Sequence, residues 1–445
     1  MADVDLVVIG AGNAGLAAAA AARVDGRTVT VIERRDPGGT CPIRGCVPKK
    51  VLVAAAETLD TIARAAVHGI HVAAPTVDWP TLIARKREFV RSVPADVAAS
   101  LTAQGIGLVR GEARFVGRTE VAVGADRYRA RQIVVATGST PRRLGFPGGA
   151  GLPTSDDLLE LDALPRAIVF VGGGPIAFEF AHVFARMGVA VTIVETGARA
   201  LSRVDEALAE RVVAATRALG VRIEAGVDVR RVDGERVEAV RDGVALDVAG
   251  RVFNVAGRVA DTATLDLAAA GVDTDAHGAP ILDRFQRSAS NLAIAFAGDA
   301  HPGLPQLSPL ATREGALAWR SLSETDPVAI DPRSVPAALF TVPPAAWVGR
   351  TLADAQSAGI DVEVHDTDTA GWRSARTYGD DTAFARVLIE RTTRRLVGAH
   401  LIGRSAPEVI HAFAFVIRHD LAVDELRDAV AVYPTFHADL KSLIE

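Results

Sequence analysis

Two stretches of this chain share one pattern: a short apolar run, a glycine-rich turn, a helix-like stretch, and a second apolar run that ends in glutamate. Short apolar runs bounded by turns are typical of buried parallel strands. The first glycine and the terminal glutamate are 23 positions apart in both copies, at residues 10 and 33 and at residues 172 and 195. The pattern therefore predicts two βαβ units. The copies comprise 6–9, Gly10–Gly15 and 29–33, and then 167–171, Gly172–Ala177 and 189–195.

Each copy carries a dinucleotide-binding fingerprint. The first glycine permits the tight turn, the second lets the backbone approach a pyrophosphate, and a small third residue lets helix and strand pack closely. The pyrophosphate lies at the helix N-terminus, and the acid accepts the ribose hydroxyls. One such motif alone could be an ordinary glycine turn, but two in full context predict two bound dinucleotides. The positions are Gly10, Gly12, Gly15 and Glu33, and Gly172, Gly174, Ala177 and Glu195.

The chain contains only two cysteines, Cys41 and Cys46, in a turn framed by glycine and proline. Cysteines with this spacing on the first turn of a helix can close a small reducible disulfide. Lys49 and Lys50, with the helix N-terminus, would lower a thiol pKa. The alternative is two small buried residues that happen to be near each other. Two cysteines cannot form a secreted disulfide framework, so a reducing cytoplasm is expected.

Composition narrows the function classes. The 445 residues are 49% apolar, which predicts a globular protein of two to four domains. A net charge of −5 argues against binding to nucleic acid or an anionic membrane. The apolar stretch 6–22 has no cationic start and is interrupted by glycines, so neither a signal peptide nor a membrane span is expected. The ten histidines lack metal-ligand spacing, so no metal is predicted.

Further motifs extend these features along the chain. Their order resembles the flavin-dependent pyridine nucleotide–disulfide oxidoreductases, which include dihydrolipoamide dehydrogenase, glutathione reductase and mercuric reductase. Each motif alone could be a common loop, and their order and spacing make the set specific. The motifs are Ala136–Gly138, Ala256–Arg258, Ala297–Asp299, Gln306–Pro309, Leu339–Thr341 and Gly398–His400.

The resemblance implies an α/β protein with two Rossmann-like dinucleotide-binding domains, for FAD and NAD, and a C-terminal α/β dimerisation domain. It implies a homodimer whose active sites are shared across the subunits. Strands are expected near 382–390 and 395–402 and a helix at 407–419, after a linker at 326–336. The implied boundaries are 1–148 and 259–327 for FAD, 149–258 for NAD(P), and 328–445 for dimerisation.

The resemblance also assigns residues to the cofactors. For FAD they are Gly10, Gly12, Gly15, Glu33, Gly39, Thr40, Lys50, Ala113, Thr137, Gly138, Asp299 and Leu307. For the nicotinamide nucleotide they are Gly172, Gly174, Glu179, Glu195 and Gly257. Glu195 favours NADH, because a carboxylate repels the extra phosphate of NADPH. Arg199 and Arg203 could soften that preference, so NADPH remains possible.

The implied catalytic residues are Cys41, Cys46, Lys50, Glu179 and Tyr433. In the family, hydride passes from the nicotinamide to the flavin, which reduces the disulfide on its other face. Cys46 would face the flavin, and Cys41 would meet the substrate. Lys50 and Glu179 match a family ion pair beside the flavin. Glu179 could instead be a solvated helix carboxylate, but its position between two phenylalanines favours burial, and a buried carboxylate needs a partner.

The C-terminal segment departs from the family pattern. Tyr433 stands where the family has an acid–base histidine, and Ala438 replaces the glutamate that orients it. Tyrosine, with a reference pKa near 10, is a poor proton shuttle at pH 7, but it can donate a hydrogen bond. His437 could substitute in part or be a surface residue. Pro175 stands where glutathione reductases have a gating tyrosine, and no cysteine follows Cys46.

Three functions remain open from the sequence. The first is an NAD(P)H-dependent flavoenzyme that reduces a disulfide or another thiol-reactive small molecule through Cys41 and Cys46. The second is a diaphorase, in which the flavin reduces quinones, dyes or oxygen directly. The third is a redox-responsive binding protein that carries both nucleotides with little turnover.

Overall fold

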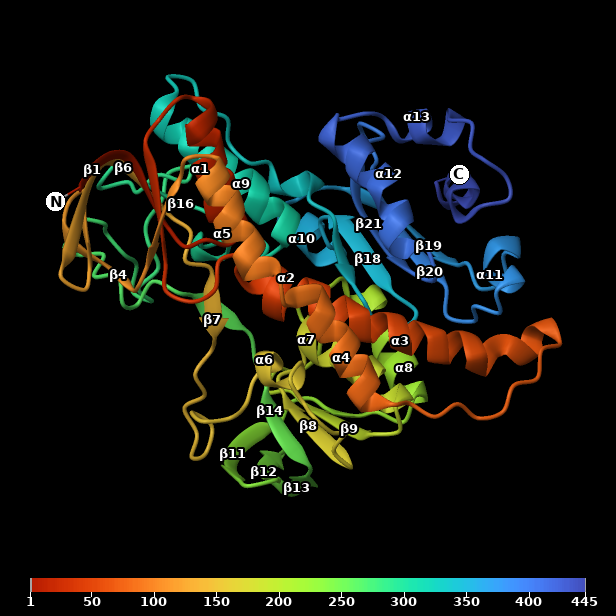
Figure 1. Cartoon of the computed structure of the whole chain (residues 1–445). Coiled ribbons are helices and arrows are strands. Elements are labelled where there is room, and N and C mark those ends of the chain that lie inside the picture. Colours follow the sequence, from red (N-terminus) through yellow and green to blue (C-terminus); the bar gives the residue numbers. More distant parts are fainter. Residues whose placement is uncertain (1, 445) are drawn as a thin grey trace. The chain divides into compact units, whose positions relative to one another are not determined.

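The computed structural model describes residues 2–444, which form two compact units. The first consists of Met1–Lys49, Ala84–Arg142 and Arg258–Ile330. The second consists of Lys50–Ile83, Arg143–Gly257 and Asp331–Glu445. Each unit contains one copy of the repeat, and Figure 1 labels many of their elements. The domain boundaries that the resemblance implies stay a prediction.

A mostly parallel sheet forms the centre of the first unit. Its order is β3-β2-β1-β6-β5-β4, with β16 also paired to β6. Strands β1, β2, β3, β6 and β16 pair in parallel, whereas β4 and β5 pair antiparallel. The apolar run 6–9 is buried within β1, as expected. The strands are β1 (Ala2–Ile9), β2 (Val29–Glu33), β3 (Gly107–Arg110), β4 (Ala113–Gly117), β5 (Glu120–Val123), β6 (Asp126–Val135) and β16 (Ile294–Phe296).

Two helices of the first unit, α1 (Asn13–Val24) and α9 (Ser308–Ser323), pack closely against each other (Figure 1). A Cβ added at Gly315 would lie 1.9 Å from the carbonyl oxygen of Ala14, so the two backbones touch at this point. Alanines of both helices line the core around Trp319. The other elements are α2 (Thr40–Arg44), α5 (Val93–Ala103), β7 (Ser139–Pro141), β15 (Arg258–Ala260) and η2 (Gly298–Ala300).

The second copy of the repeat forms a four-stranded parallel sheet with the order β10-β9-β8-β14. The strand order matches β3-β2-β1-β6 of the first unit. In each copy the glycine turn therefore follows a strand that has neighbours on both sides, which is where such sheets bind nucleotides. The elements are β8 (Ala167–Val171), α7 (Pro175–Arg186), β9 (Ala190–Val194), α8 (Glu206–Ala218), β10 (Arg222–Glu224) and β14 (Arg251–Asn254), with the antiparallel strands β11 (Asp228–Asp233), β12 (Arg236–Arg241) and β13 (Val244–Ala249).

The C-terminal part of the second unit is a five-stranded antiparallel sheet with the order β17-β18-β21-β20-β19. The strands expected near 382–390 and 395–402 are β20 (Phe384–Glu390) and β21 (Leu396–Ile402). The expected helix is α12 (Ala406–Arg418), which packs on β18 and β21 (Figure 1). The remaining elements are β17 (Ala337–Leu339), β18 (Ala345–Gly349), β19 (Val362–Asp368), α10 (Leu352–Ser357), α11 (Arg373–Thr377), α13 (Val423–Asp428), η3 (Pro332–Ser334) and η4 (Phe436–Leu443), and, earlier in the chain, α3 (Cys46–Arg64), η1 (Ala65–His68), α4 (Trp79–Val90) and α6 (Ser155–Leu158).

Candidate active site

The first glycine turn joins β1 to α1. Gly10 has a φ of +108°, a conformation that favours glycine. A Cβ at Gly10 would lie 2.2 Å from the carbonyl oxygen of Ala136, and one at Gly15 would lie 1.9 Å from the carbonyl oxygen of Gly10. The turn is thus pressed against the end of β6 and the start of α1. The N-terminus of α1 can present its backbone N–H groups to a pyrophosphate.

The second glycine turn repeats this geometry. Gly172 has a φ of +116°, and a Cβ there would lie 2.5 Å from the Cα of Ala256. Ala177 stands at the third position and is fully buried. Apart from Gly174 itself and its neighbours along the chain, no described atom lies within 4 Å of a Cβ added at Gly174. The backbone in front of α7 is therefore open to a ligand.

The two terminal acids make equivalent hydrogen bonds. Glu33 accepts from the backbone N–H groups of Ala11 and Arg35, both at 2.7 Å. Glu195 accepts from Gly173 at 2.5 Å and Gly197 at 2.6 Å. In both copies the donors are the residue after the first glycine and the residue two beyond the acid. Each carboxylate is held beside its glycine turn, where ribose hydroxyls would be accepted.

The two cysteines lie on separate helices, not on one helical turn. Cys41 belongs to α2 and Cys46 begins α3, and Gly45 breaks the helix between them. Both cysteines are free thiols. Cys41 is half-buried and Cys46 is exposed, and a hydrogen bond joins their side chains.

The acidity of Cys41 has several causes. Hydrogen bonding from Cys46, which is the largest, and from the Ser308 hydroxyl lowers the pKa of the Cys41 thiol from 9.0 to about 6, against the opposing effect of burial. The nearby charge of Lys49 also lowers this pKa. The sequence predicted that a lysine lowers the thiol pKa. It missed the hydrogen bonds from Cys46 and Ser308, which lower the pKa of Cys41 more than the charge of Lys49 does. At pH 7 the pair therefore carries one reactive thiolate.

The first unit fits FAD on two independent observations. The Thr137 hydroxyl, just after β6, is buried and has no hydrogen-bond partner among the described residues. Gly39 has a φ of +73°, and a Cβ there would lie 2.7 Å from the Cα of Gly12, so the backbone before α2 lies directly on the glycine turn. An unsatisfied polar atom and a turn with no room for a side chain are features of a ligand cradle.

Polar side chains surround Asp299, which the resemblance assigns to FAD. Asp299 accepts a hydrogen bond from the Ser139 hydroxyl at 2.7 Å, and Arg258 donates to the same hydroxyl at 2.8 Å. Glu314 is almost fully buried, and its carboxyl accepts from the backbone N–H of Gly298 at 2.8 Å. Burial, with the nearby charge of Asp299, raises the pKa of Glu314 to about 8. Glu314 therefore keeps its proton at pH 7.

The other predicted FAD residues of the first unit lie at or beside the ends of helices and strands. Thr40 begins α2 and is exposed, and Leu307 directly precedes α9. Gly138, like Gly257 of the second unit, has a positive φ, and apart from the chain neighbours of each glycine no atom of residues 2–444 lies within 4 Å of a Cβ added there. Ala113 is buried at the start of β4.

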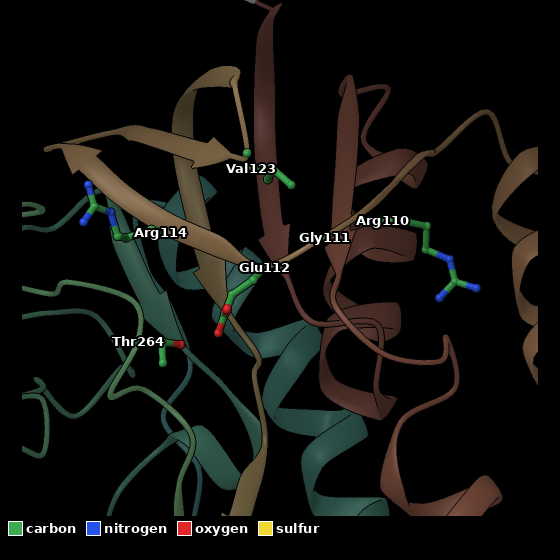
Figure 2. Close-up of a pocket in the computed structure, with 7 residues that line it drawn as sticks. Arg110, Gly111, Glu112, Arg114, Val123 and Thr264 are labelled. Atoms are coloured by element: carbon green, nitrogen blue, oxygen red, sulfur yellow. The ribbon is translucent and has the colours of Figure 1, made fainter.

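A cavity of about 520 Å³ lies beside Ala113 (Figure 2). Its lining includes Glu112, whose carboxylate lies 3.4 Å from the Arg34 guanidinium. Figure 2 shows the guanidinium groups of Arg110 and Arg114 pointing away from each other, so they do not form one anion site. The lining residues are Arg110, Gly111, Glu112, Arg114, Val123, Gly124 and Thr264.

In the second unit, Lys50 and Glu179 both contact Phe340. The Lys50 ammonium lies 4.7 Å from the centre of the Phe340 ring and forms an ion pair with Glu57 at 2.8 Å. Glu179 is buried, as expected, and accepts a hydrogen bond from the Phe340 backbone N–H at 2.9 Å. The sequence did not anticipate Glu57 as a partner of Lys50. The direct Lys50–Glu179 pair stays a prediction.

The C-terminal segment is anchored to α11. The Tyr433 hydroxyl accepts a hydrogen bond from the Arg373 guanidinium, and the Ser374 hydroxyl donates to Asp439. Tyr433 is 65% exposed in the single chain. His437 is also exposed in the single chain.

The described residues contain no helix long and apolar enough to cross a membrane. Within the same residues, no group of three or more histidine, cysteine, aspartate or glutamate side chains is arranged to hold a metal ion.

Comparison with known proteins identifies the family. Residues 4–315 match the family model described as pyridine nucleotide-disulphide oxidoreductase, and residues 335–444 match the dimerisation domain of that family. The chain is 32% identical over 444 residues to a glutathione reductase of Burkholderia cepacia, covering 99% of this chain and 98% of the relative. The chain therefore belongs to the pyridine nucleotide-disulphide oxidoreductases.

Two further comparisons agree. A mercuric reductase of Bacillus cereus is 30% identical over 447 residues, covering 99% of this chain and 70% of the relative. The structure of the Cu(II) complex of RclA, an HOCl-induced flavoprotein disulfide reductase of Escherichia coli, is similar with a TM-score of 0.88 and 27% identity. It covers 100% of this chain and 99% of the RclA chain.

These findings confirm the predicted fold and show a flavoprotein disulfide oxidoreductase of a family that uses FAD and NAD(P)H. The dimerisation domain implies a homodimer. Because the chain belongs to a family of enzymes, the third interpretation, a binding protein with little turnover, has no support.

Proposed function

We propose that this chain is an NADH-dependent reductase in which Cys41 and Cys46 pass an electron pair to a disulfide or another thiol-reactive small molecule. The observation that carries the proposal is the hydrogen-bonded cysteine pair with one thiol pKa near 6. Bound FAD would supply the ring that takes the hydride from the nicotinamide and reduces the Cys41–Cys46 disulfide. The net reaction converts one NADH, one proton and one substrate disulfide into NAD⁺ and two thiols.

The thiol steps follow from the acidity of the pair. The Cys41 thiolate attacks the substrate disulfide, which forms a mixed disulfide and releases the first product sulfur. Cys46 then attacks the Cys41 sulfur, which releases the second product and restores the Cys41–Cys46 disulfide. By resemblance, Tyr433 of the partner subunit would meet the substrate. Because Arg373 donates to the Tyr433 hydroxyl, the single proton of Tyr433 remains available to a product sulfur or a substrate oxygen.

Selective blocking of the thiols tests this route. After reduction by NADH, alkylation of Cys41 with iodoacetamide should stop turnover of a low-molecular-weight disulfide and leave quinone reduction unchanged. Loss of both activities to the same extent would argue against separate routes. Disulfide turnover that survives complete alkylation would exclude the thiol relay.

The diaphorase remains the second candidate, because Tyr433 and Ala438 replace the acid–base pair of the family. Direct transfer from flavin to a quinone needs no thiol and no acid–base histidine. This candidate predicts that cysteine variants keep the physiological turnover, whereas the thiol relay predicts its loss.

The nucleotide is proposed to be NADH. Two backbone N–H groups fix the Glu195 carboxylate where the ribose hydroxyls would lie. Arg199 could have attracted the phosphate of NADPH, but its guanidinium donates to the backbone carbonyls of Leu201, Ser202 and Val204 at 3.0, 2.9 and 3.1 Å. The guanidinium of Arg199 therefore binds the backbone of its own loop and is not directed toward a phosphate.

Replacing Glu195 with alanine should reduce the preference for NADH over NADPH, measured as the ratio of kcat/KM values, by at least about tenfold, which corresponds to about 1.4 kcal/mol. The reason is that the variant loses both the ribose acceptor and the charge that repels phosphate. Arg203→Ala tests the other arginine of this loop, which is exposed, and should raise the ratio if Arg203 attracts the phosphate of NADPH. A wild-type enzyme that prefers NADPH would contradict the assignment.

A further inference from the structure

We propose that Asn13 is a positioning residue for the Cys41 thiolate, because it fixes the direction in which the Ser308 hydroxyl donates its proton. Asn13 is the first residue of α1, inside the FAD glycine turn, and Ser308 is the first residue of α9. The Asn13 side-chain amide donates to the Ser308 hydroxyl oxygen at 2.6 Å. The Ser308 hydroxyl in turn forms a hydrogen bond with Cys41. Three residues distant in the sequence therefore form one chain of hydrogen bonds.

The direction of this chain follows from counting protons. A serine hydroxyl has one proton, a primary amide nitrogen can only donate, and a thiolate can only accept. Because Asn13 supplies a proton to the Ser308 oxygen, Ser308 cannot donate back to that nitrogen. Its proton is left for the Cys41 sulfur. A donated hydrogen bond to the charged form of a group stabilises that form.

The fold holds this chain in place without help from the thiols. Ala14, next to Asn13, lies against α9 so closely that a Cβ at Gly315 would be 1.9 Å from its carbonyl oxygen. The helices also share the alanine-rich core of the first unit. The two helix N-termini that carry Asn13 and Ser308 are therefore fixed relative to each other.

Two further groups that act on Cys41, Cys46 and Lys49, are on α3. Cys46 donates a hydrogen bond and Lys49 contributes its charge, so both favour the thiolate as Ser308 does. They remain when Asn13 is changed. The loss of Asn13 should therefore shift the acidity of Cys41 without abolishing it.

The inference rests on the proposed role of Cys41, but its test measures the reactivity of the Cys41 thiol and not enzyme turnover. The rate at which iodoacetamide modifies Cys41 in the chemically reduced holoenzyme is measured against pH, with the site identified by mass spectrometry. Asn13→Leu, which has no donor and no charge, should raise the midpoint of the Cys41 profile by about one pH unit. Below the midpoint this makes alkylation about tenfold slower.

A double-mutant cycle separates this role from a general structural one. Ser308→Ala should raise the midpoint by at least as much as Asn13→Leu, and Asn13→Leu should add nothing in the Ser308→Ala background. Ser308→Thr keeps the hydroxyl and should keep the wild-type midpoint. A midpoint unchanged by Asn13→Leu, or a shift that persists without Ser308, would overturn the proposal.

The content of FAD is measured in every variant, since Asn13 lies in the cofactor turn. Asn13→Asp, which keeps the size and shape of the side chain, is a second variant. Its Cys41 alkylation midpoint is measured in the wild-type and the Ser308→Ala backgrounds. Its carboxylate would accept the Ser308 proton and should raise the midpoint more than Asn13→Leu does. Asn13→Asp should therefore raise the midpoint less in the Ser308→Ala background than in the wild-type background. An equal rise in the two backgrounds would contradict the hydrogen-bond chain.

Discussion

Replacing Cys46 with alanine is expected to reduce NADH-dependent turnover of disulfide substrates by at least about a thousandfold. Cys41 alone cannot form or restore the internal disulfide, so each mixed disulfide would be a dead end. The change also removes the hydrogen bond that does most to lower the pKa of Cys41, so less thiolate is present at pH 7. The measurement is kcat with a low-molecular-weight disulfide, at saturating NADH.

The same preparation contains the control. Cys46 is exposed at the start of α3, so its truncation leaves no buried cavity, and FAD should remain bound at the wild-type stoichiometry. Quinone reduction should continue at the wild-type rate, because that route does not use the thiols. Disulfide turnover near the wild-type value in Cys46→Ala would show that the cysteines lie outside the electron path.

Replacing Gly39 with alanine is expected to weaken FAD binding by at least about tenfold, equivalent to about 1.4 kcal/mol. A Cβ at this position would lie 2.7 Å from the Cα of Gly12, the residue whose backbone approaches the pyrophosphate. Since the obstacle is backbone, the glycine turn or the start of α2 must move. The measurement is FAD stoichiometry after gel filtration, followed by titration of the apoprotein with FAD.

Gly26→Ala is the matched control for this prediction. Gly26 has the same φ of +73°, but apart from its chain neighbours no described atom lies within 4 Å of an added Cβ. Both variants place an alanine at a positive φ, and Gly39→Ala adds a ψ of −161°, a combination that essentially only glycine adopts, together with the collision. Equal loss of FAD in the two variants would attribute the effect to general destabilisation and not to the cradle.

The nucleotide-binding parts could be predicted from the sequence because their determinants are local. A buried strand, a glycine turn and an acid 23 positions on place Glu33 and Glu195 beside their turns in the same way. The acids' partners are either the residue after the first glycine or lie two positions beyond the acid. Contacts between residues so close to the motif are set by local backbone geometry, so the sequence pattern predicts them.

The details of the thiol site could not be predicted this way. Asn13 and Ser308 are 295 positions apart, so no spacing rule connects them. The cysteines were expected on one helical turn, but Gly45 ends the first helix and Cys46 begins another. Family resemblance directed attention to Glu179 as the partner of Lys50, whereas the pairing with Glu57 depends on how α3 itself presents two side chains seven positions apart. A signal did exist for Ser308, since it lies in the motif Gln306–Pro309.

The most direct test of the thiol relay is an anaerobic titration of the purified holoenzyme with NADH, in which the flavin spectrum and the number of free thiols are followed together. FAD and the Cys41–Cys46 disulfide each accept two electrons. The relay therefore predicts the uptake of two equivalents of NADH and the appearance of both cysteines as thiols. Bleaching of the flavin by one equivalent, with the disulfide still closed, would contradict the relay and leave the diaphorase as the function of this fold.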